Sequence, residues 1–420
     1  MHSFHTSLRE RSIEETLAYA QEYARKLGVT RVTDITRLDS LGIHVFSSIR
    51  PGAVAGTLCV NSGKGLRKEE ARIGAYMEAI EFAMAEYNRA GLPTFHAPLT
   101  QVLDGASRPN AFLDLAPLNG KQLDPEKPIE QVLMMDLNTG QYLPVPAELV
   151  FMPYFHPDDR VQYGSNTNGL ASGNSQDEAT LHALLEVLER DVLSFYHLRP
   201  RGVRQIPPES WPETVTKVAG QADRHGVKLA VQAIDNEFGL PVFRAVLLDY
   251  HHQDPLFING GYGCHFRREV ALSRAVSEAF QSRLVYIHGG RDDLADTHAV
   301  NDTLTPEEKK AQFQELEQEA LHGGPVTSIS DIHEYAWQAG SSAEYLDRLK
   351  ELLCDHGFDR LLRVVFTQPE EPLQVVKMVV PGLEHFNPDY QRVGRRLYAY
   401  HQELVKQDQA QTDAGNAAVE

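Results

Sequence analysis

The sequence predicts an α/β (α+β) fold in which mixed sheets pack against acidic helices. Helical and strand-like segments alternate along the 420 residues, which favours this class over a helical bundle or a β-sandwich. Apolar residues make up 42% of the chain, an ordinary share for a globular protein that needs no disulfide framework. The three cysteines agree with this, because they lie far apart and lack metal-ligand spacing.

The first elements have clear boundary signals. Ser12-Ile-Glu-Glu15 is a capping box, which predicts the start of an amphipathic helix. Strand-like segments follow at 32–35 and 44–49, before a turn at Pro51-Gly52.

Three glycine-rich segments are predicted to be loops, and each leads into a helix. They run from 61–65 into 71–81, from 166–174 into 178–191, and from 260–265 into 267–284. Backbone N–H groups at such a loop and helix start attract phosphate oxygens, and Lys64 would add a positive charge. An ordinary turn is the alternative for the Gly-Lys-Gly loop at 61–65, and its position before the acidic helix favours the phosphate-binding interpretation.

Acidic residues of the first two helices share a helix face. Residues three or four apart stack on one side of an α-helix. The residues placed in this way are Glu78 with Glu81, and Glu178, His182, Glu186 and Glu189. Their apolar neighbours predict burial, and buried carboxylates without basic partners favour a cation such as Mg²⁺. The alternatives are a solvated acidic face and, for His182, a satisfied core or capping histidine.

The third helix combines a cation, an acid and an amide on one stripe. Arg274, Glu278 and Gln281 recur at i, i+4 and i+7, whereas Arg283 falls about half a turn from Gln281. A simple salt bridge within the helix is the alternative for Arg274 and Glu278. Cys264, just before this helix, is interpreted as a buried apolar filler rather than a nucleophile.

The rest of the chain continues the alternation. Residues 90–160 are rich in Pro, Asp, Asn and Gly and are predicted to be a loop-rich excursion with a hairpin around 136–140. Further helices are expected at 212–225, from Thr305 and from Ser341, and strands at 227–234, 242–248, 362–366 and 374–380. The predicted parts are an N-terminal helix and strands (1–60), a catalytic domain (61–400) and a disordered tail (405–420).

Charge and composition exclude several classes. Lys and Arg number 40 against 58 Asp and Glu, a net charge of −18, which argues against nucleic acid or an anionic membrane as the main partner. The first residues lack the apolar core of a signal peptide, and no run of eighteen apolar residues occurs. We therefore expect a cytoplasmic protein.

Together these segments resemble the YcaO family over roughly residues 31–396. The stretches that carry the resemblance are Ser62-Gly-Lys-Gly65, Glu78-x-x-Glu81, Asn168-Gly-Leu-Ala-Ser-Gly173, His182-Ala-Leu-Leu-Glu-Val-Leu-Glu-Arg-Asp191, Gly263-Cys-His265 and Glu278-Ala-Phe-Gln-Ser-Arg283. Gly290-Arg-Asp-Asp293 and Val380-Pro-Gly-Leu383 add to it.

The resemblance implies an enzyme that uses ATP and Mg²⁺ to activate a backbone amide of a ribosomally made peptide or of a protein. In that family a nucleophile adds to the amide carbonyl, and ATP phosphorylates the resulting oxygen, which then leaves as phosphate. A Cys, Ser or Thr nucleophile yields an azoline ring, external sulfide yields a thioamide, and an amine yields an amidine.

The resemblance also assigns roles to residues of this sequence. Mg²⁺ or its waters would bind Glu78, Glu81, Glu186, Glu189 and Glu278. The nucleotide would bind Lys64, Arg190 and Arg283 through its phosphates, with Asn168 shaping its pocket and Gln281 orienting a phosphate oxygen or a metal-bound water. The residues expected to carry catalysis are Glu186, Glu189, Arg190 and Gln281.

The sequence departs from the family pattern at three places. Gly74 and Phe82 stand where members often have Ser and Arg. The chain ends Ala417-Ala-Val-Glu420, whereas azoline-forming members commonly end in a Pro-x-Pro-x-Pro tail. This difference favours the members that work with a TfuA-like protein.

Partner and class expectations follow from this. We expect a precursor peptide or protein as substrate, a TfuA-like or leader-binding protein as partner, and a homodimer as one open oligomeric state. Thioamide and azoline products stay open. Two other classes also stay open: a non-catalytic YcaO-like scaffold that presents a peptide to a partner enzyme, and a metallohydrolase that uses the Glu/His helix without nucleotide.

Overall fold

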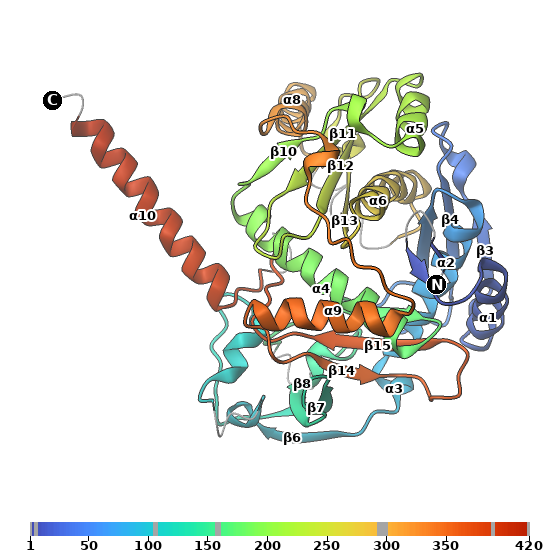
Figure 1. The fold of residues 1–420 in the computed structure, drawn as a ribbon, viewed down its shortest axis with the longest axis vertical. Helices are drawn as coiled ribbons and strands as arrows, with labels where there is room; N and C mark the ends of the chain where they lie inside the picture. The colour runs from blue at the N-terminus through green and yellow to red at the C-terminus, as the bar shows by residue number, and fades with distance from the viewer. Residues whose placement is uncertain are drawn as a thin grey trace.

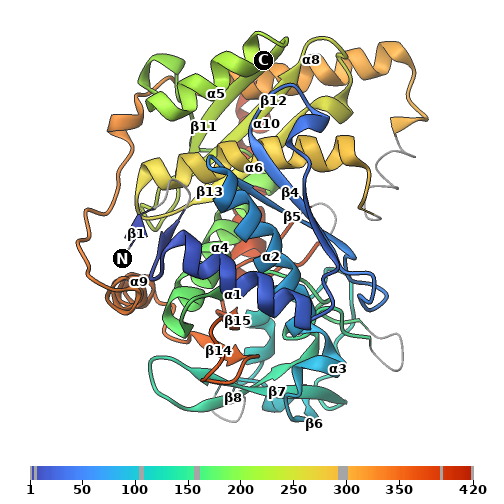
Figure 2. The ribbon, with the colours of Figure 1, turned by 90° about the vertical axis from the view of Figure 1, so that its right-hand side faces the viewer.

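The computed structural model describes residues 2–3, 7–103, 108–155, 161–291, 301–387 and 391–417. Within these residues the strands form four sheets, and every strand pairing inside a sheet is antiparallel. Three of the sheets each pack against helices (Figures 1 and 2). The predicted combination of mixed sheets and packed acidic helices is therefore confirmed.

The first sheet contains β3 (Arg31–Asp34), β4 (His44–Ile49) and β5 (Val60–Gly65) in that order. Helices α1 (Ile13–Lys26) and α2 (Lys68–Ala85) pack together beside it. The predicted capping box is present, since the Ser12 side chain accepts from the Glu15 N–H and Glu15 reaches back to Ser12. Because β4 pairs with β5, the boundary predicted at residue 60 runs through a sheet rather than between two folding units.

The second sheet has six strands. They are β6 (Thr94–Pro98), β7 (Pro128–Asp136), β14 (Leu362–Val365), β15 (Gln374–Val379) and β9 (Leu170–Gly173) in that order, with β8 (Tyr142–Pro146) beside β7. Helices α3 (Tyr87–Ala90), α4 (Gln176–Leu198) and α9 (Ser342–Asp355) belong to this part, and α4 packs on β9, β15 and α9. Residues 90–160 therefore contribute three strands, including the predicted hairpin β7–β8, and are not mainly loop.

The third sheet contains β10 (Val203–Gln205), β11 (Val227–Ile234), β12 (Val242–Asp249) and β13 (Asn259–Cys264) in that order. Its helices are α5 (Glu213–Asp223), α6 (Arg268–His288) and α8 (Pro306–His322). Contacts with β13 and β12 hold α6 on one face of the sheet. A short hairpin of β1 (His2–Ser3) and β2 (Leu8–Arg9) completes the strands of the described residues.

The C-terminal segment differs from the prediction. Helix α10 spans Arg395–Ala417 and extends away from the body of the molecule (Figure 1). Of the tail predicted to be disordered, 405–417 belong to α10 in this structure, and 418–420 lie outside the described residues. Ion pairs between Arg199 and Asp408, and between Arg396 and Asp191, connect α10 to α4 and to the residue that follows α4.

The three glycine-rich segments predicted as loops contain the strands β5, β9 and β13. Each strand lies at an edge of its sheet and leads directly into α2, α4 or α6. A Cβ on Gly63 would lie 2.0 Å from the Ala75 nitrogen, and one on Gly263 would lie 2.1 Å from the Ala271 oxygen. These glycines therefore let each helix approach its strand closely. Because glycine is rare in strands, the same composition is typical of loops in a sequence.

Candidate functional site

The open edges of β5, β9 and β13 face one region, where α2, α4 and α6 meet in the middle of the molecule (Figure 2). An edge strand carries backbone N–H groups without a strand partner. In this protein, glutamates from the three helices accept hydrogen bonds from these groups. These hydrogen bonds therefore hold the three sheet edges and the glutamates of the three helices in one region.

Helix α2 supplies two of these glutamates. Glu78 accepts a hydrogen bond from the Ser62 N–H of β5 at 2.6 Å. One turn later, Glu81 accepts from the N–H of Ser172 in β9 at 2.8 Å and from its hydroxyl at 2.5 Å. Glu78 and Glu81 therefore connect one helix to the edges of two different sheets.

Helices α4 and α6 complete the set at β13. Glu189 of α4 accepts from the Cys264 N–H at 2.9 Å. Glu278 of α6 accepts a longer bond from the Tyr262 N–H at 3.4 Å and forms an ion pair with Lys64 of β5. This interaction between separate sheets replaces the salt bridge within α6 that the sequence left open for Glu278.

A cavity of about 470 Å³ lies between these elements. All five predicted metal ligands line it, namely Glu78, Glu81, Glu186, Glu189 and Glu278. Lys64, Arg190 and Gln281 line the same cavity. The structure thus brings together eight of the ten residues that the sequence predicted for the site.

Burial and like charge make this a poor place for unneutralised carboxylates. Burial raises the pKa of Glu81 to about 8, and the nearby Glu78 and Glu186 add to the rise. Burial also raises the pKa of Glu186 to about 7, although Arg190 opposes this. The pKa values of Glu78 and Glu189 are raised for the same main reason.

Glu278 is the exception among the five acids. Burial alone would raise its pKa, but Lys64 and then Arg190 outweigh that effect and hold the pKa below its ordinary value. Arg190 also lies 4.0 Å from Glu186 on the same helix. One side of the cavity is therefore already neutralised by bases, while Glu81 and Glu186 have a raised pKa.

The donor set suits Mg²⁺ that shares its coordination with waters and phosphate oxygens. No three His, Cys, Asp or Glu side chains converge tightly enough in the described part of the chain to hold a metal ion by themselves. Mg²⁺ usually keeps several waters and binds proteins through only one or two carboxylates. A bound cation would also favour the ionised form of acids such as Glu81, whose pKa burial raises.

Gln281 is held in a defined orientation. Its side-chain N–H₂ donates to the Ser62 carbonyl at 3.0 Å and to the Ser62 hydroxyl at 2.8 Å. Its amide oxygen has no recorded donor among the described residues, so it can accept from a metal-bound water. This geometry suits the orienting role that the resemblance implied.

Arg283 and Asn168 do not reach this cavity. The Arg283 guanidinium is buried between Asp39 at 2.7 Å and Asp249 at 2.9 Å, an ion pair within the core. The phosphate-binding role predicted for Arg283 is therefore corrected, because its position half a turn from Gln281 points it to the opposite side of α6. Asn168 lines a separate small cavity, while its neighbour Thr167 lines the large one.

Three further sequence predictions concern Cys264, His182 and the Gly-Arg-Asp-Asp element, and their outcomes differ. Burial raises the pKa of the Cys264 thiol, which agrees with a buried filler. His182 is not fully satisfied, since its Nε2 has no partner among the described residues. Asp292 and Asp293 of the Gly-Arg-Asp-Asp element lie outside the described residues, whereas Arg291 lines the large cavity.

Sequence reasoning did not assign two further basic residues near the site. Arg274 lines the large cavity, and its place four residues before Glu278 was the available signal. Lys377 of β15 is buried and donates to the Asn166 carbonyl at 2.6 Å. The available signal for Lys377 was its position as a lone charged residue within an apolar strand.

The fold and this carboxylate cavity define a class of protein that binds a nucleotide with metal ions, and comparisons with known proteins specify the family. A model described as YcaO cyclodehydratase, ATP- and Mg²⁺-binding, matches residues 62–384. An uncharacterized protein of Methanothermobacter thermautotrophicus is 31% identical over 389 residues, covering 91% of this chain and 97% of the relative. The chain belongs to the YcaO family.

A further relative is similar in sequence, and solved structures are similar in fold. A Rhizobium leguminosarum bv. trifolii protein encoded in the tfuA 3′ region is 31% identical, with 91% of this chain and 90% of that protein covered. The YcaO structure of Methanopyrus kandleri, bound with AMPPCP and Mg²⁺, is similar with a TM-score of 0.73 at 23% identity, covering 94% and 97%. A heterocyclase in complex with substrate and cofactor has a TM-score of 0.71 at 20% identity, covering 94% of this chain. This chain spans 55% of that heterocyclase.

Within the described ranges, no helix is long and apolar enough to cross a bilayer.

Proposed function

We propose that this protein uses ATP and Mg²⁺ to activate a backbone amide of a peptide, which then becomes an azoline or a thioamide. The observation that carries the proposal is the single cavity into which three helices bring five carboxylates, together with Lys64, Arg190 and Gln281. Membership of a family described as ATP- and Mg²⁺-binding supports the same assignment.

The chemistry explains why such a site is needed. An amide oxygen is a poor leaving group, and its phosphorylation by ATP allows it to depart as phosphate. Transfer of a phosphoryl group depends on positioning and on neutralisation of the phosphate charge. In this protein the carboxylates would bind Mg²⁺, while the bases would bind phosphate oxygens directly.

Individual residues have separate tasks in this proposal. Lys64 pairs with Glu278 at the wall of the cavity. Its ammonium group would exchange this partner for a phosphate oxygen when the nucleotide binds. Arg190 would provide a second cation from α4, and Glu186 and Glu189 of the same helix would hold Mg²⁺. Gln281 would accept from a metal-bound water, held in place by Ser62.

A partner protein is part of the proposal. One relative is encoded in the tfuA 3′ region, which supports the TfuA-like partner expected from the resemblance. An E. coli microcin synthetase complex with pro-MccB17 bound has a similar fold, with a TM-score of 0.59 at 15% identity. We propose that a partner delivers the peptide substrate.

The test is phosphate release that depends on a peptide. The full chain would be incubated with Mg²⁺-ATP and a pool of capped hexapeptides that contain Cys, Ser, Thr or Gly, with and without sodium sulfide. We expect peptide-stimulated phosphate release and, by mass spectrometry, loss of one water or exchange of one oxygen for sulfur. The reactions with the peptide pool would be repeated after addition of a TfuA-like protein from the same organism as this chain.

Other outcomes would assign other classes. If the protein neither binds nucleotide nor releases phosphate with any peptide, the non-catalytic scaffold is favoured. Hydrolysis that continues after ATP is removed would favour the metallohydrolase. Either result would overturn the proposed amide activation.

A further inference from the structure

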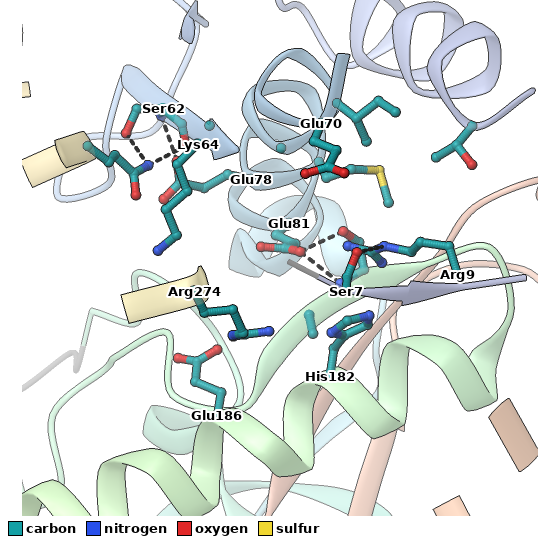
Figure 3. Close-up of a pocket in the computed structure, with 18 of the residues that line it drawn as sticks. Ser7, Arg9, Ser62, Lys64, Glu70, Glu78, Glu81, His182, Glu186 and Arg274 are labelled. Carbon is teal, nitrogen blue, oxygen red and sulfur yellow. Dashed lines mark hydrogen bonds between the residues drawn. The ribbon is translucent and has the colours of Figure 1, made fainter. Parts of the chain in front are cut away.

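A second cavity of about 280 Å³ lies beside the first one (Figure 3). Residues of the proposed nucleotide site form the wall between them, including Lys64, Glu78, Glu186, Arg274 and Gln281, which line both cavities. A group bound in the second cavity would therefore be next to the phosphates in the first. This is the position that an acceptor amide requires.

The lining of the second cavity fits a short peptide segment. Ile13, Ile73, Met77 and Leu170 provide apolar surface, while Ser7 and Ser172 provide polar groups. Its volume lies near the lower end of the range for small-ligand sites, about 300–1,000 Å³. Such a space accommodates one or two residues of an extended chain.

His182 of α4 presents an unpartnered nitrogen at this cavity. It lines the cavity, and Figure 3 shows its ring directed from α4 toward Ser7, with Glu186 on the same helix and Arg274 between the two. Its Nε2 is shielded from solvent and has no hydrogen-bond partner among the described residues. A shielded polar atom without a partner is costly, unless a ligand completes it.

The other side of the His182 ring is occupied. The ring forms a hydrogen bond with the Leu8 backbone of β2 that raises its pKa, which identifies the ring as donor and a carbonyl oxygen as acceptor. In a neutral imidazole one nitrogen donates and the other accepts. We therefore assign the proton to Nδ1 and the free electron pair to Nε2.

Strand β2 is held firmly enough to fix this tautomer. The buried Glu178 accepts from the Arg9 guanidinium at 2.8 Å and from the Glu10 N–H at 2.9 Å. Asn174 donates to the same carboxylate at 3.1 Å. Glu178, which the sequence placed on the acidic face, thus anchors the strand that orients His182.

We infer that the second cavity binds the acceptor amide of the peptide and that His182 Nε2 accepts the proton released when phosphate departs. This inference rests on the proposed amide activation. In the azoline case the C–O bond breaks, its electron pair leaves with phosphate, and the N–H electron pair forms C=N while the proton goes to His182. In the thioamide case the proton comes from S–H, and the sulfur electrons form C=S.

The surrounding charges support a neutral base at this position. Burial, followed by Arg9 and Arg274, holds the pKa of His182 well below its usual range, so the ring is unprotonated near neutral pH. Of the acids that line the same cavity, Glu78 and Glu81 accept bonds from the edge strands, and Glu186 lies 4.0 Å from Arg190. The Nε2 lone pair of His182 has no partner among the described residues and is available to the substrate.

The inference is tested by His182→Ala with chemical rescue. Peptide-stimulated phosphate release should fall about 100-fold or more, the usual range for loss of a general base. Affinity for AMPPCP with Mg²⁺, measured by calorimetry, should change less than twofold, because His182 lines the second cavity only. Added imidazole should restore part of the peptide-dependent rate. The matched control is His322→Ala, which replaces an exposed histidine at the end of α8. Its phosphate release and AMPPCP affinity should equal those of the wild type, and imidazole should not alter its rate.

Three results would overturn the inference. An unchanged rate would exclude His182, and so would a rate that imidazole does not restore in a protein with the wild-type melting temperature. A parallel loss of AMPPCP affinity and melting temperature would assign His182 a structural role. If wild-type phosphate release responds to no peptide, the proposed function itself fails, which distinguishes that failure from a failure of His182 alone.

Discussion

Replacement of Glu81 by Gln should stabilise the protein at alkaline pH while it abolishes activity. Glu81 binds the edge of β9 through the N–H and hydroxyl of Ser172, and a glutamine oxygen can accept both bonds. The substitution therefore removes the ionisable group and keeps its contacts. A stabilising mutation at a functional residue is expected where an active site retains groups that folding alone disfavours.

The magnitude follows from the pKa of Glu81. Burial raises the pKa to about 8 from an ordinary 4.5, so the folded protein retains a proton that the unfolded chain loses between these pH values. The stability contributed by this group is full below pH 4.5 and is lost as the pH rises to about 8. At 1.36 kcal/mol per pH unit, the loss at pH 8 is about 4 kcal/mol. Partial exposure to the cavity screens it, so we expect about 2–4 kcal/mol.

The assay is urea unfolding of the wild type and Glu81→Gln at pH 5 and pH 8. The variant should gain about 2–4 kcal/mol relative to the wild type at pH 8 and much less at pH 5. Glu69→Gln, at an exposed position of the same helix, is the matched control and should behave alike at both values. Mg²⁺ with AMPPCP should stabilise the wild type more than Glu81→Gln. Parallel pH profiles for the wild type and Glu81→Gln would refute the reasoning.

Three other substitutions test separate parts of the structure. Glu186→Gln should lower peptide-stimulated phosphate release at least 100-fold without lowering the melting temperature, and unchanged ATP use would contradict the metal-binding role. Arg283→Met should cost about 3–5 kcal/mol, because it removes the guanidinium that lies between two buried carboxylates, whereas AMPPCP affinity of the folded protein should stay the same. Gly63→Ala should destabilise by more than about 2 kcal/mol, since its Cβ would meet the α2 backbone at 2.0 Å, whereas Gly74→Ala, with a nearest contact of 3.2 Å, should cost far less. Equal melting temperatures for these two glycine variants would contradict the close packing of β5 on α2.

Much of the secondary structure was predictable from local signals. The capping box at Ser12 marks the start of α1, and the β-branched and aromatic residues at 44–49 identify β4. These signals act within a few residues, so the sequence contains them in full. The three glycine-rich edge strands were missed, because their glycines reflect contacts with helices rather than local conformation.

Many of the residues that form the site were also predictable from local signals. Spacing on α2 and α4 identified Glu78, Glu81, Glu186 and Glu189 as residues of one chemistry, and all four line one cavity. Spacing could not place Arg283, because a difference of half a turn decides between a cavity and the core. The edge-strand N–H groups that these acids bind were also invisible, since they depend on which strands are outermost in their sheets.

The sequence by itself determined which helices are acidic and apolar at once, the family to which they belong, and most of the residues that reach the site. These properties depend on the period of the helix, which is local. The tertiary structure decided how three separate sheets turn their open edges toward one cavity, which base neutralises Glu278, and which nitrogen of His182 remains available. Those outcomes depend on contacts between residues that are up to about two hundred positions apart, and chain folding alone brings such residues together.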